Sequence, residues 1–195
     1  MTPPAKGILF DFDGTLSLIR KDWLEVMIAM MVAVLRQTGT QESKDDLTGL
    51  TTQFVKNLTG RQTIYQMIRL CEEIEKRGGA PLAPLEYKEL YNERLDAAIS
   101  NRLEAVRGGR LPREDFLVPG SLEFLEELTS RGVRCYLASG TDEDLVKRDA
   151  ALLGFDHLFE GRTVDKEIIL AILLSGAPAP GGVRNRDRNI HTIFR

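Results

Sequence analysis

Two short apolar runs constrain the fold of this chain more than any other feature of its sequence. They are Lys6–Phe10 and Val133–Ala138, and both end at small or polar residues, Asp11-Phe12-Asp13-Gly14-Thr15 and Ser139-Gly140-Thr141. A run of roughly 4–8 apolar residues that ends in a turn is typical of a strand buried on both faces, as in a parallel sheet. The two runs therefore predict neighbouring strands of an α/β fold.

The sequence between these runs has a helical pattern. Apolar residues recur at helical spacing over residues 22–38, 63–77 and 84–107, and glycines follow each segment. Glycine is the typical residue just after the last turn of a helix. Residues 17–115 are therefore predicted to form an all-helical insertion.

Helical segments also follow the insertion. The spacing predicts helices over Ser121–Ser130, from Thr141 to Leu153, and over Asp165–Leu174. Strands that alternate with helices through short connections indicate βαβ units. Residues 1–16 and 116–174 are therefore assigned to one α/β core.

Composition and charge exclude several classes of protein. The formal net charge is -3 and the pI is about 5.6, which gives no general electrostatic case for nucleic acid or an anionic membrane as a partner. The longest apolar-rich run, Trp23–Leu35, contains Glu25 and is shorter than the roughly 20 residues of a membrane span. Cys71 and Cys135 are expected to be reduced packing residues, and the expected location is the cytoplasm.

Two carboxylates follow the first run. Asp11 and Asp13 are two positions apart at the predicted carboxyl end of a strand, the edge at which α/β sheets bind ligands. Such a pair can hold Mg²⁺ and divide the roles of nucleophile and acid–base, and the amides of Gly14 and Thr15 could meet an anion. The spacing alone, without its context, favours a solvated acidic turn.

The motif context favours the functional interpretation. Asp11-Phe12-Asp13-Gly14-Thr15-Leu16 after an apolar strand resembles the first motif of the haloacid dehalogenase-like (HAD) hydrolase superfamily. Leu137–Gly140 is similar to the second motif, and Val118-Pro119-Gly120 to the usual lead-in to it. The resemblance covers residues 6–174 and implies a Rossmann-like core with the insertion as a C1-type cap.

The resemblance also implies roles for individual residues. Asp11 would attack phosphorus to give an aspartyl-phosphate, and Asp13 would serve as general acid and base. Mg²⁺ would be bound by an Asp11 oxygen and the Asp13 backbone carbonyl, and Ser139 and the Gly140 amide would bind phosphoryl oxygens. An aspartate at position 13 implies a phosphatase or phosphomutase rather than a dehalogenase. The expected function is a Mg²⁺-dependent phosphoric monoester hydrolase for a small phosphorylated metabolite.

Two cationic residues are candidates for the remaining substrate contacts. Lys166 is the best match to the lysine of the third motif, although the usual Lys-Pro is missing, and a plain surface lysine is the alternative. Lys147 is the rival candidate, but its place within a helix favours a solvated side chain. Arg61, in a polar turn of the cap, could contact the substrate's leaving group or be an ordinary exposed arginine.

The fourth motif, an apolar strand that ends in acidic residues, is missing. Only Glu167 and Asp187 bear carboxylates after Lys166, and Ile190–Phe194 looks too short to replace the strand. The core sheet is therefore expected to be incomplete at its C-terminal side, with the first strand as an exposed edge through which copies could associate. A second interpretation of the chain follows, a catalytically impaired protein that acts as a binding module.

The last segment differs in composition from the rest. Residues 175–195 are rich in Ala, Pro, Gly and Arg and carry four arginines against one aspartate. Such a composition buries little apolar surface, so this segment is expected to be a disordered tail. A shifted reading frame or a truncated gene would account for it.

Overall fold

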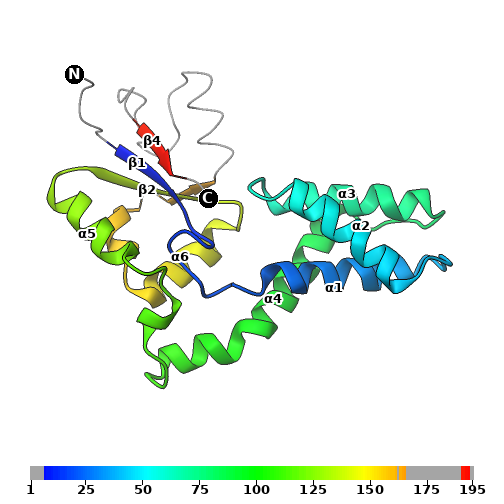
Figure 1. The fold of residues 1–195 in the computed structure, drawn as a ribbon, viewed down its shortest axis with the longest axis horizontal. Coiled ribbons are helices and arrows are strands. Elements are labelled where there is room, and N and C mark those ends of the chain that lie inside the picture. The colour runs from blue at the N-terminus through cyan, green and yellow to red at the C-terminus, as the bar shows by residue number, and fades with distance from the viewer. Residues whose placement is uncertain (1–6, 162, 166–189, 194–195) are drawn as a thin grey trace. The chain divides into compact units, whose positions relative to one another are not determined.

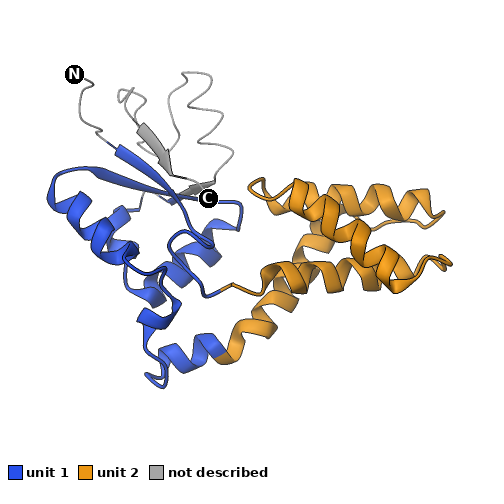
Figure 2. Cartoon of the chain, in the orientation of Figure 1, with its two compact units in different colours: residues 1–19, 102–195 blue, residues 20–101 orange. Residues whose placement is uncertain are grey.

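The computed structural model describes residues 7–161, 163–165 and 190–193 of the 195-residue chain (Figure 1). The chain divides into two compact units, residues 1–19 with 102–195 and residues 20–101 (Figure 2). Residues 17–19 and 102–115, which the sequence pattern assigned to the insertion, therefore group with the first unit.

The first unit contains a parallel sheet. Its strands are β1 (Gly7–Asp11), β2 (Arg134–Ser139), β3 (Thr163–Asp165) and β4 (Ile190–Ile193), in the order β3-β2-β1-β4. Helix α5 (Ser121–Ser130) packs against β2, and α6 (Glu143–Leu153) packs against β3. The 3-10 segments η1 (Arg113–Phe116) and η2 (Asp156–Phe159) complete the described elements of this unit. The predicted α/β fold with a parallel sheet is confirmed.

The prediction that β1 is an edge strand was wrong. Gly7 to Phe10 pair in parallel with Ile190 to Ile193, while Gly7 to Asp11 pair with β2 on the other side. Three of the four β4 residues are β-branched and favour extended backbone, and an unpaired strand edge offers free amides and carbonyls. Four residues are therefore enough to cover β1, and this part of the expected disordered tail is a strand.

The expectation for the segment after Gly161 also needs correction. Asp165, predicted to open a helix, is the last residue of β3, which pairs with β2 from Leu137 to Ser139. The remainder of the expected helix, residues 166–174, and the tail segment 175–189 lie outside the described residues.

Aromatic side chains form the centre of this unit. Phe10, Phe12, Phe155 and Phe159 are at most 2% exposed. The Phe12 and Phe155 ring centroids are 6.0 Å apart, and Phe10 meets Phe159 edge to face at 6.4 Å. Rings at these distances bury large areas and add favourable edge-to-face contacts. The two residues that flank Asp11 are thus fixed on both sides by the core.

Two backbone segments of the first unit, residues 16–18 and 116–118, hydrogen-bond to each other. The Leu18 amide donates to the Phe116 carbonyl at 2.8 Å, and the Val118 amide donates to the Leu16 carbonyl at 3.0 Å. Ser17 and Leu117 form an antiparallel bridge between them. These bonds join the segment after the Asp11–Thr15 turn to the segment before α5.

The second unit is helical. It comprises α1 (Trp23–Arg36), α2 (Lys44–Asn57), α3 (Thr63–Lys76) and most of α4 (Pro84–Arg107). Sequence reasoning missed α2, whose signal is the capping box in which the Ser43 hydroxyl accepts from the Asp46 amide at 3.1 Å. Its apolar residues are sparse, and the buried ones, Leu47, Phe54 and Val55, pack one face.

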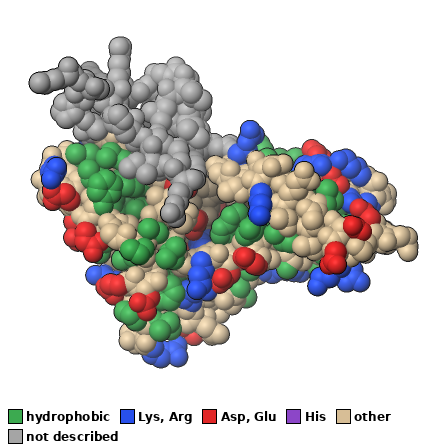
Figure 3. Space-filling view, in the orientation of Figure 1, with side chains coloured by type: hydrophobic (Ala, Val, Ile, Leu, Met, Phe, Trp, Pro, Cys, Tyr) green, Lys and Arg blue, Asp and Glu red, His purple; other side chains and the backbone are tan. Residues whose placement is uncertain are grey.

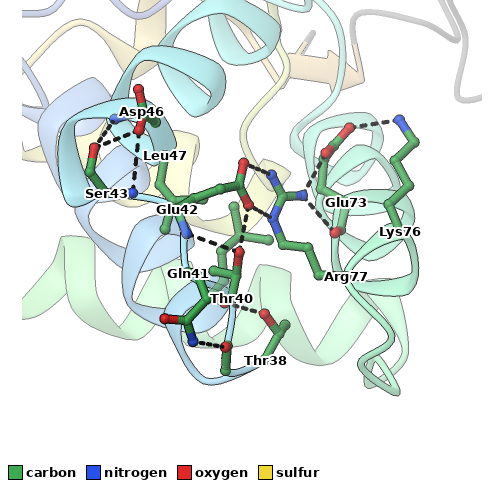
Figure 4. A network of polar contacts seen from close by, with 12 residues as sticks. Thr38, Thr40, Gln41, Glu42, Ser43, Asp46, Leu47, Glu73, Lys76 and Arg77 are labelled. Carbon is green, nitrogen blue, oxygen red and sulfur yellow. Dashed lines mark hydrogen bonds and ion pairs between the residues drawn. The ribbon is translucent and has the colours of Figure 1, made fainter.

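A polar network ties α3 to the loop before α2 (Figure 4). Glu73 is 4% exposed, and its carboxylate accepts from Arg77 at 2.7 Å and from Lys76 at 2.8 Å. Burial raises the pKa of Glu73, but the hydrogen bonds from Lys76 and Arg77 outweigh this effect and hold the pKa below its ordinary value. Arg77 also donates to Glu42, at 2.5 and 2.7 Å, so one guanidinium joins two carboxylates.

The outer face of the molecule is charged and mixed. Acidic and basic side chains are interspersed over the face drawn in Figure 3. None of the helices in the described part of the chain combines the length and apolarity that crossing a membrane requires.

Cys71 and Cys135 are free thiols, as predicted, and burial raises the pKa of the Cys71 thiol.

Candidate active site

Two of the expected site residues end adjacent parallel strands. Asp11 is the last residue of β1 and lies opposite Ala138 of β2, and Ser139 is the next and last residue of β2. Because the strands are parallel, both carboxyl ends meet at the same edge of the sheet. The structure therefore places Asp11, the loop that follows it, and Ser139 with Gly140 at one edge.

The turn after Asp11 is built around one carbonyl. The Phe12 carbonyl accepts from the amides of Thr15, Leu16 and Ser17 at 3.0 to 3.3 Å, and the Gly14 amide donates to the Ser17 carbonyl at 2.9 Å. Gly14 has a φ of +76°, a conformation that favours glycine. The amides of Gly14 and Thr15 are thus engaged within the turn, contrary to the expectation that they would meet an anion.

Thr141 links the two loops and was missed by sequence reasoning. Its hydroxyl donates to Asp13 Oδ2 at 3.1 Å, and its amide donates to the Ser139 hydroxyl oxygen at 3.1 Å. Ser139 is 3% exposed, and the part-buried hydrogen bond from the Thr141 amide orients its hydroxyl. The Ser-x-Thr spacing was a usable signal, because a serine side chain often accepts from the amide two residues later.

The start of α6 adjoins the same loop. The helix begins at Glu143, four residues after Ser139, and has 11 residues. The N-terminus of a helix carries a partial positive charge that favours anions nearby. Together with a buried serine hydroxyl, this arrangement suits the binding of an anionic group at the carboxyl end of β2.

The structure describes one of the two lysine candidates. Lys147 lies on α6 with its side chain about half exposed, and its ammonium is 2.5 Å from Glu143. The hydrogen bond to Glu143 raises the pKa of Lys147 above its ordinary value. Lys147 is therefore part of a surface ion pair, whereas Lys166 lies outside the described residues.

Arg61 belongs to the helical unit. It is exposed in the turn before α3, and its guanidinium lies over the Tyr65 ring, 6.0 Å from the centroid. This cation–π contact stabilises Arg61 at the surface and does not indicate whether Arg61 contacts a substrate.

The residues present can be compared with the requirements of Mg²⁺. The ion is commonly bound by one or two carboxylates, with waters and substrate phosphate oxygens completing the octahedron. Asp11 offers one carboxylate and Asp13 a backbone carbonyl oxygen, which meets this minimum. Across residues 7–161, 163–165 and 190–193, no group of three or more His, Cys, Asp or Glu side chains could hold a metal ion. The donor set thus fits Mg²⁺ with one protein carboxylate and one carbonyl oxygen.

Strand β4 lies where the fourth motif of the resembled superfamily is expected, next to β1. Its residues are Ile-His-Thr-Ile, and Glu167 and Asp187, the carboxylates that follow Lys166 in sequence, both precede it. The carboxyl end of β4 is followed by Phe194 and Arg195. The neighbouring strand is therefore present, and its own four residues include no acidic side chain.

Solved structures with a similar fold were found. A predicted phosphoglycolate phosphatase from Haemophilus somnus matches with a TM-score of 0.50 and 16% identity, over 91% of this chain and 75% of that chain. CbbY from Rhodobacter sphaeroides, in complex with xylulose-(1,5)bisphosphate, matches with a TM-score of 0.56 and 15% identity, over 97% and 77%. Likenesses at these identities support the fold.

Sequence comparison gives the family. A search of curated proteins found no significant match. The family model described as haloacid dehalogenase-like hydrolase matches residues 5–183, a range that includes both strand-end motifs. With Asp11 and Asp13 after β1 and Ser139 at the end of β2, this chain belongs to the haloacid dehalogenase-like hydrolase family.

Proposed function

We propose that the protein is a phosphoric monoester hydrolase that acts on a small phosphorylated metabolite through an aspartyl-phosphate on Asp11. The observation that carries the proposal is the arrangement of Asp11 and Ser139 at adjacent strand ends, with Asp13 bonded to Thr141 between them. The names of the two structural neighbours, a phosphoglycolate phosphatase and a protein bound to a sugar bisphosphate, support a small phosphate ester as substrate.

The first half-reaction transfers the phosphoryl group to the protein. An Asp11 carboxylate oxygen forms a bond to phosphorus while the bond from phosphorus to the ester oxygen breaks. Asp13 donates its proton to the departing alkoxide, so the alcohol leaves neutral.

The second half-reaction releases inorganic phosphate. Asp13, now ionised, takes a proton from a water molecule as the water oxygen bonds to phosphorus, and the bond from phosphorus to Asp11 breaks. The Ser139 hydroxyl and Gly140 amide hold phosphoryl oxygens in both steps, and Lys166 offsets their charge. The carboxylate and the acid are thus each restored after one turnover.

A Mg²⁺ ion would be held by an Asp11 oxygen and the Asp13 backbone carbonyl, and would offset the repulsion between the anionic substrate and the carboxylate. The core segments 1–16 and 116–174 would supply the chemistry. The helical cap, of C1 type and assigned to residues 17–115 from the sequence, would supply substrate contacts, with Arg61 as one candidate.

A second candidate function follows from β4. Since the four residues of β4 include no carboxylate, the strand itself offers the ion no acidic ligand, and the chain could serve as an impaired binding module. This candidate predicts a folded, monodisperse protein that releases no phosphate at any Mg²⁺ concentration.

One experiment separates these candidates. Inorganic phosphate release is measured with Mg²⁺ on phosphoglycolate, several sugar phosphates and p-nitrophenyl phosphate. The matched variants are Asp11→Asn, and Glu126→Gln at an exposed position of α5. We expect Asp11→Asn to lower kcat by about 10⁴-fold or more, as loss of a nucleophile does, and Glu126→Gln to leave it unchanged. Release that persists in folded Asp11→Asn would contradict the proposed mechanism.

A further inference from the structure

The surface between α1 and α2, outside the candidate active site, forms an open groove of about 480 Å³. Its apolar lining consists of residues of α1: Ile28, Ala29, Val32 and Ala33. Val32 is 5% exposed, whereas Ala29 and Ala33 are exposed. The groove therefore lies on the face of α1 that points away from the Met27, Met30 and Met31 core.

Charged side chains mark the ends of this groove. Glu25 lies at the N-terminal end of α1, and Arg36 lies at its C-terminal end, with Lys44 of α2 also lining the groove. All three are exposed, and within the described part of the chain none of their side chains takes part in a hydrogen bond or ion pair. At 1.5 Å per residue, Glu25 and Arg36 are about 16 Å apart along the helix.

The order of these residues along α1 is self-complementary. Glu25 and Arg36 lie at equal distances from the midpoint between residues 30 and 31, and so do Ile28 and Ala33, and Ala29 and Val32. If a second α1 runs antiparallel across the first at this midpoint, each position meets its mirror partner. Glu25 then faces Arg36 of the other copy twice, and a large apolar residue faces a small one.

We propose that the α1–α2 groove is the contact surface of a symmetric homodimer, with α1 of each copy seated antiparallel in the groove of the other. Two-fold symmetry requires that residue i contacts j while j contacts i, which this face satisfies in charge and in size. Small residues at the centre let helix axes approach to about 8–10 Å, as in antiparallel bundles. The area of two 14-residue helices is small, so the dimer is a weak, concentration-dependent one.

Sedimentation velocity over a protein concentration series tests this dimer with the full chain. We expect the unaltered protein to pass from monomer to dimer. Glu25→Arg leaves only cations at positions 25 and 36 of the pair, and Arg36→Glu leaves only anions at these positions, while Lys44 is unchanged in both variants. Each variant alone should dimerise about tenfold or more weakly, because like charges then face each other twice.

A mixture of the two charge variants is the decisive sample. An equimolar mixture of Glu25→Arg and Arg36→Glu restores opposite charges at both ends, so it should form a heterodimer at concentrations where each variant is monomeric. Ala29→Arg, at the centre of the face, should abolish dimerisation by size. Circular dichroism of each variant verifies that the exposed substitutions leave the helices folded.

Three results would overturn the proposal. The first is an unaltered chain that stays monomeric up to its solubility limit. The second is a dimer that Glu25→Arg, Arg36→Glu and Ala29→Arg leave unchanged, which would place the contact elsewhere. The third is a monomeric chain in which octanoate, but not octanol, protects the α1 amides from hydrogen exchange. That result would make the groove a binding site for a small anionic amphiphile.

Discussion

The two units of this chain combine apolar burial and polar contacts in different ways. In the α/β unit, an aromatic core around Phe10 and Phe12 fixes the backbone, and the polar residues of interest lie in turns at strand ends. In the helical unit, the buried Glu73 forms ion pairs with Lys76 and Arg77, so its polar contacts are made within the unit. The polar groups at the strand ends of the first unit can therefore serve chemistry, whereas the network around Glu73 stabilises the fold of the second.

This contrast has consequences for how each unit responds to change. A parallel sheet presents its strand ends as a rigid edge, so residues placed there are held by the packed core and by hydrogen bonds between the loops. A helix bundle with a buried carboxylate depends on the protonation state of that group. Apolar truncation should thus affect the α/β unit most, and pH should affect the helical unit most.

The largest expected effect is that of Phe12→Ala. Phe12 is fully buried against Phe155, and removal of a buried phenyl ring costs about 4 kcal/mol of the free energy of unfolding. Hydrogen exchange by mass spectrometry should show the loss of protection in β1 and β2. Fluorescence of Trp23, on α1, should report a smaller change in the helical unit.

Leu70→Ala is the matched truncation in the helical unit. Leu70 is fully buried on α3, and its loss costs about 3 kcal/mol, with deprotection in α1 to α3. If either variant lowered protection equally in both units, the two regions would share one core and the contrast would fail.

A smaller effect is expected from Glu73→Gln. The amide retains the shape of the carboxylate but not its charge, and the charged hydrogen bonds from Arg77 and Lys76 are worth about 2 kcal/mol together. Urea unfolding followed by Trp23 fluorescence measures this change. Glu72→Gln is the control, since Glu72 is about half exposed and pairs only at the surface, where a pair is worth about 0.5 kcal/mol.

The pH dependence of the helical unit follows from the same residue. Because the pKa of Glu73 is lower in the folded state than its ordinary value, its stabilising contribution is complete above that ordinary value. The contribution is lost as the pH falls through the folded-state pKa. We expect α3 to lose hydrogen-exchange protection in acid before β2 does, and Glu73→Gln to remove that difference. Equal acid sensitivity in the parent chain and the variant would contradict the assignment.

The smallest expected effect concerns Thr141. Thr141→Val removes the hydroxyl that bonds to Asp13 and keeps the side-chain shape, so it should lower kcat about tenfold through loss of one charged hydrogen bond, with KM unchanged. Thr141→Ser should restore kcat, because serine supplies the same donor. Thr129→Val, on α5, is the control. A change in KM alone would indicate that Thr141 contacts substrate rather than positioning Asp13.

Several features were predictable from local sequence. The apolar runs predicted β1 and β2, and the glycines that follow the helical segments helped to locate the helices. Both signals are local, because burial and turn chemistry depend on neighbouring residues. The first and second motifs located Asp11, Asp13 and Ser139 for the same reason. Family membership followed from these short segments.

Other features depend on contacts that one sequence does not display. β4 forms because β1 offers an unpaired side, although the four residues are too few to signal a strand alone. Thr141 bonds to a residue 128 positions earlier, so its role depends on the sheet bringing two loops together. α2 has few apolar residues, and its signal was the Ser43 and Asp46 capping box.

The most direct test of the account is whether Asp11 becomes phosphorylated. The full chain, mixed with Mg²⁺ and the best substrate of the panel, is quenched in acid within the first turnover and digested for peptide mass spectrometry. We predict a peptide containing Asp11 that is heavier by one phosphoryl group and becomes unmodified when the quench is delayed until the substrate is consumed. The same peptide should stay unmodified in Asp11→Asn. Substrate turnover with no phosphoryl group on Asp11 at any quench time, or with the group on another residue, would contradict it.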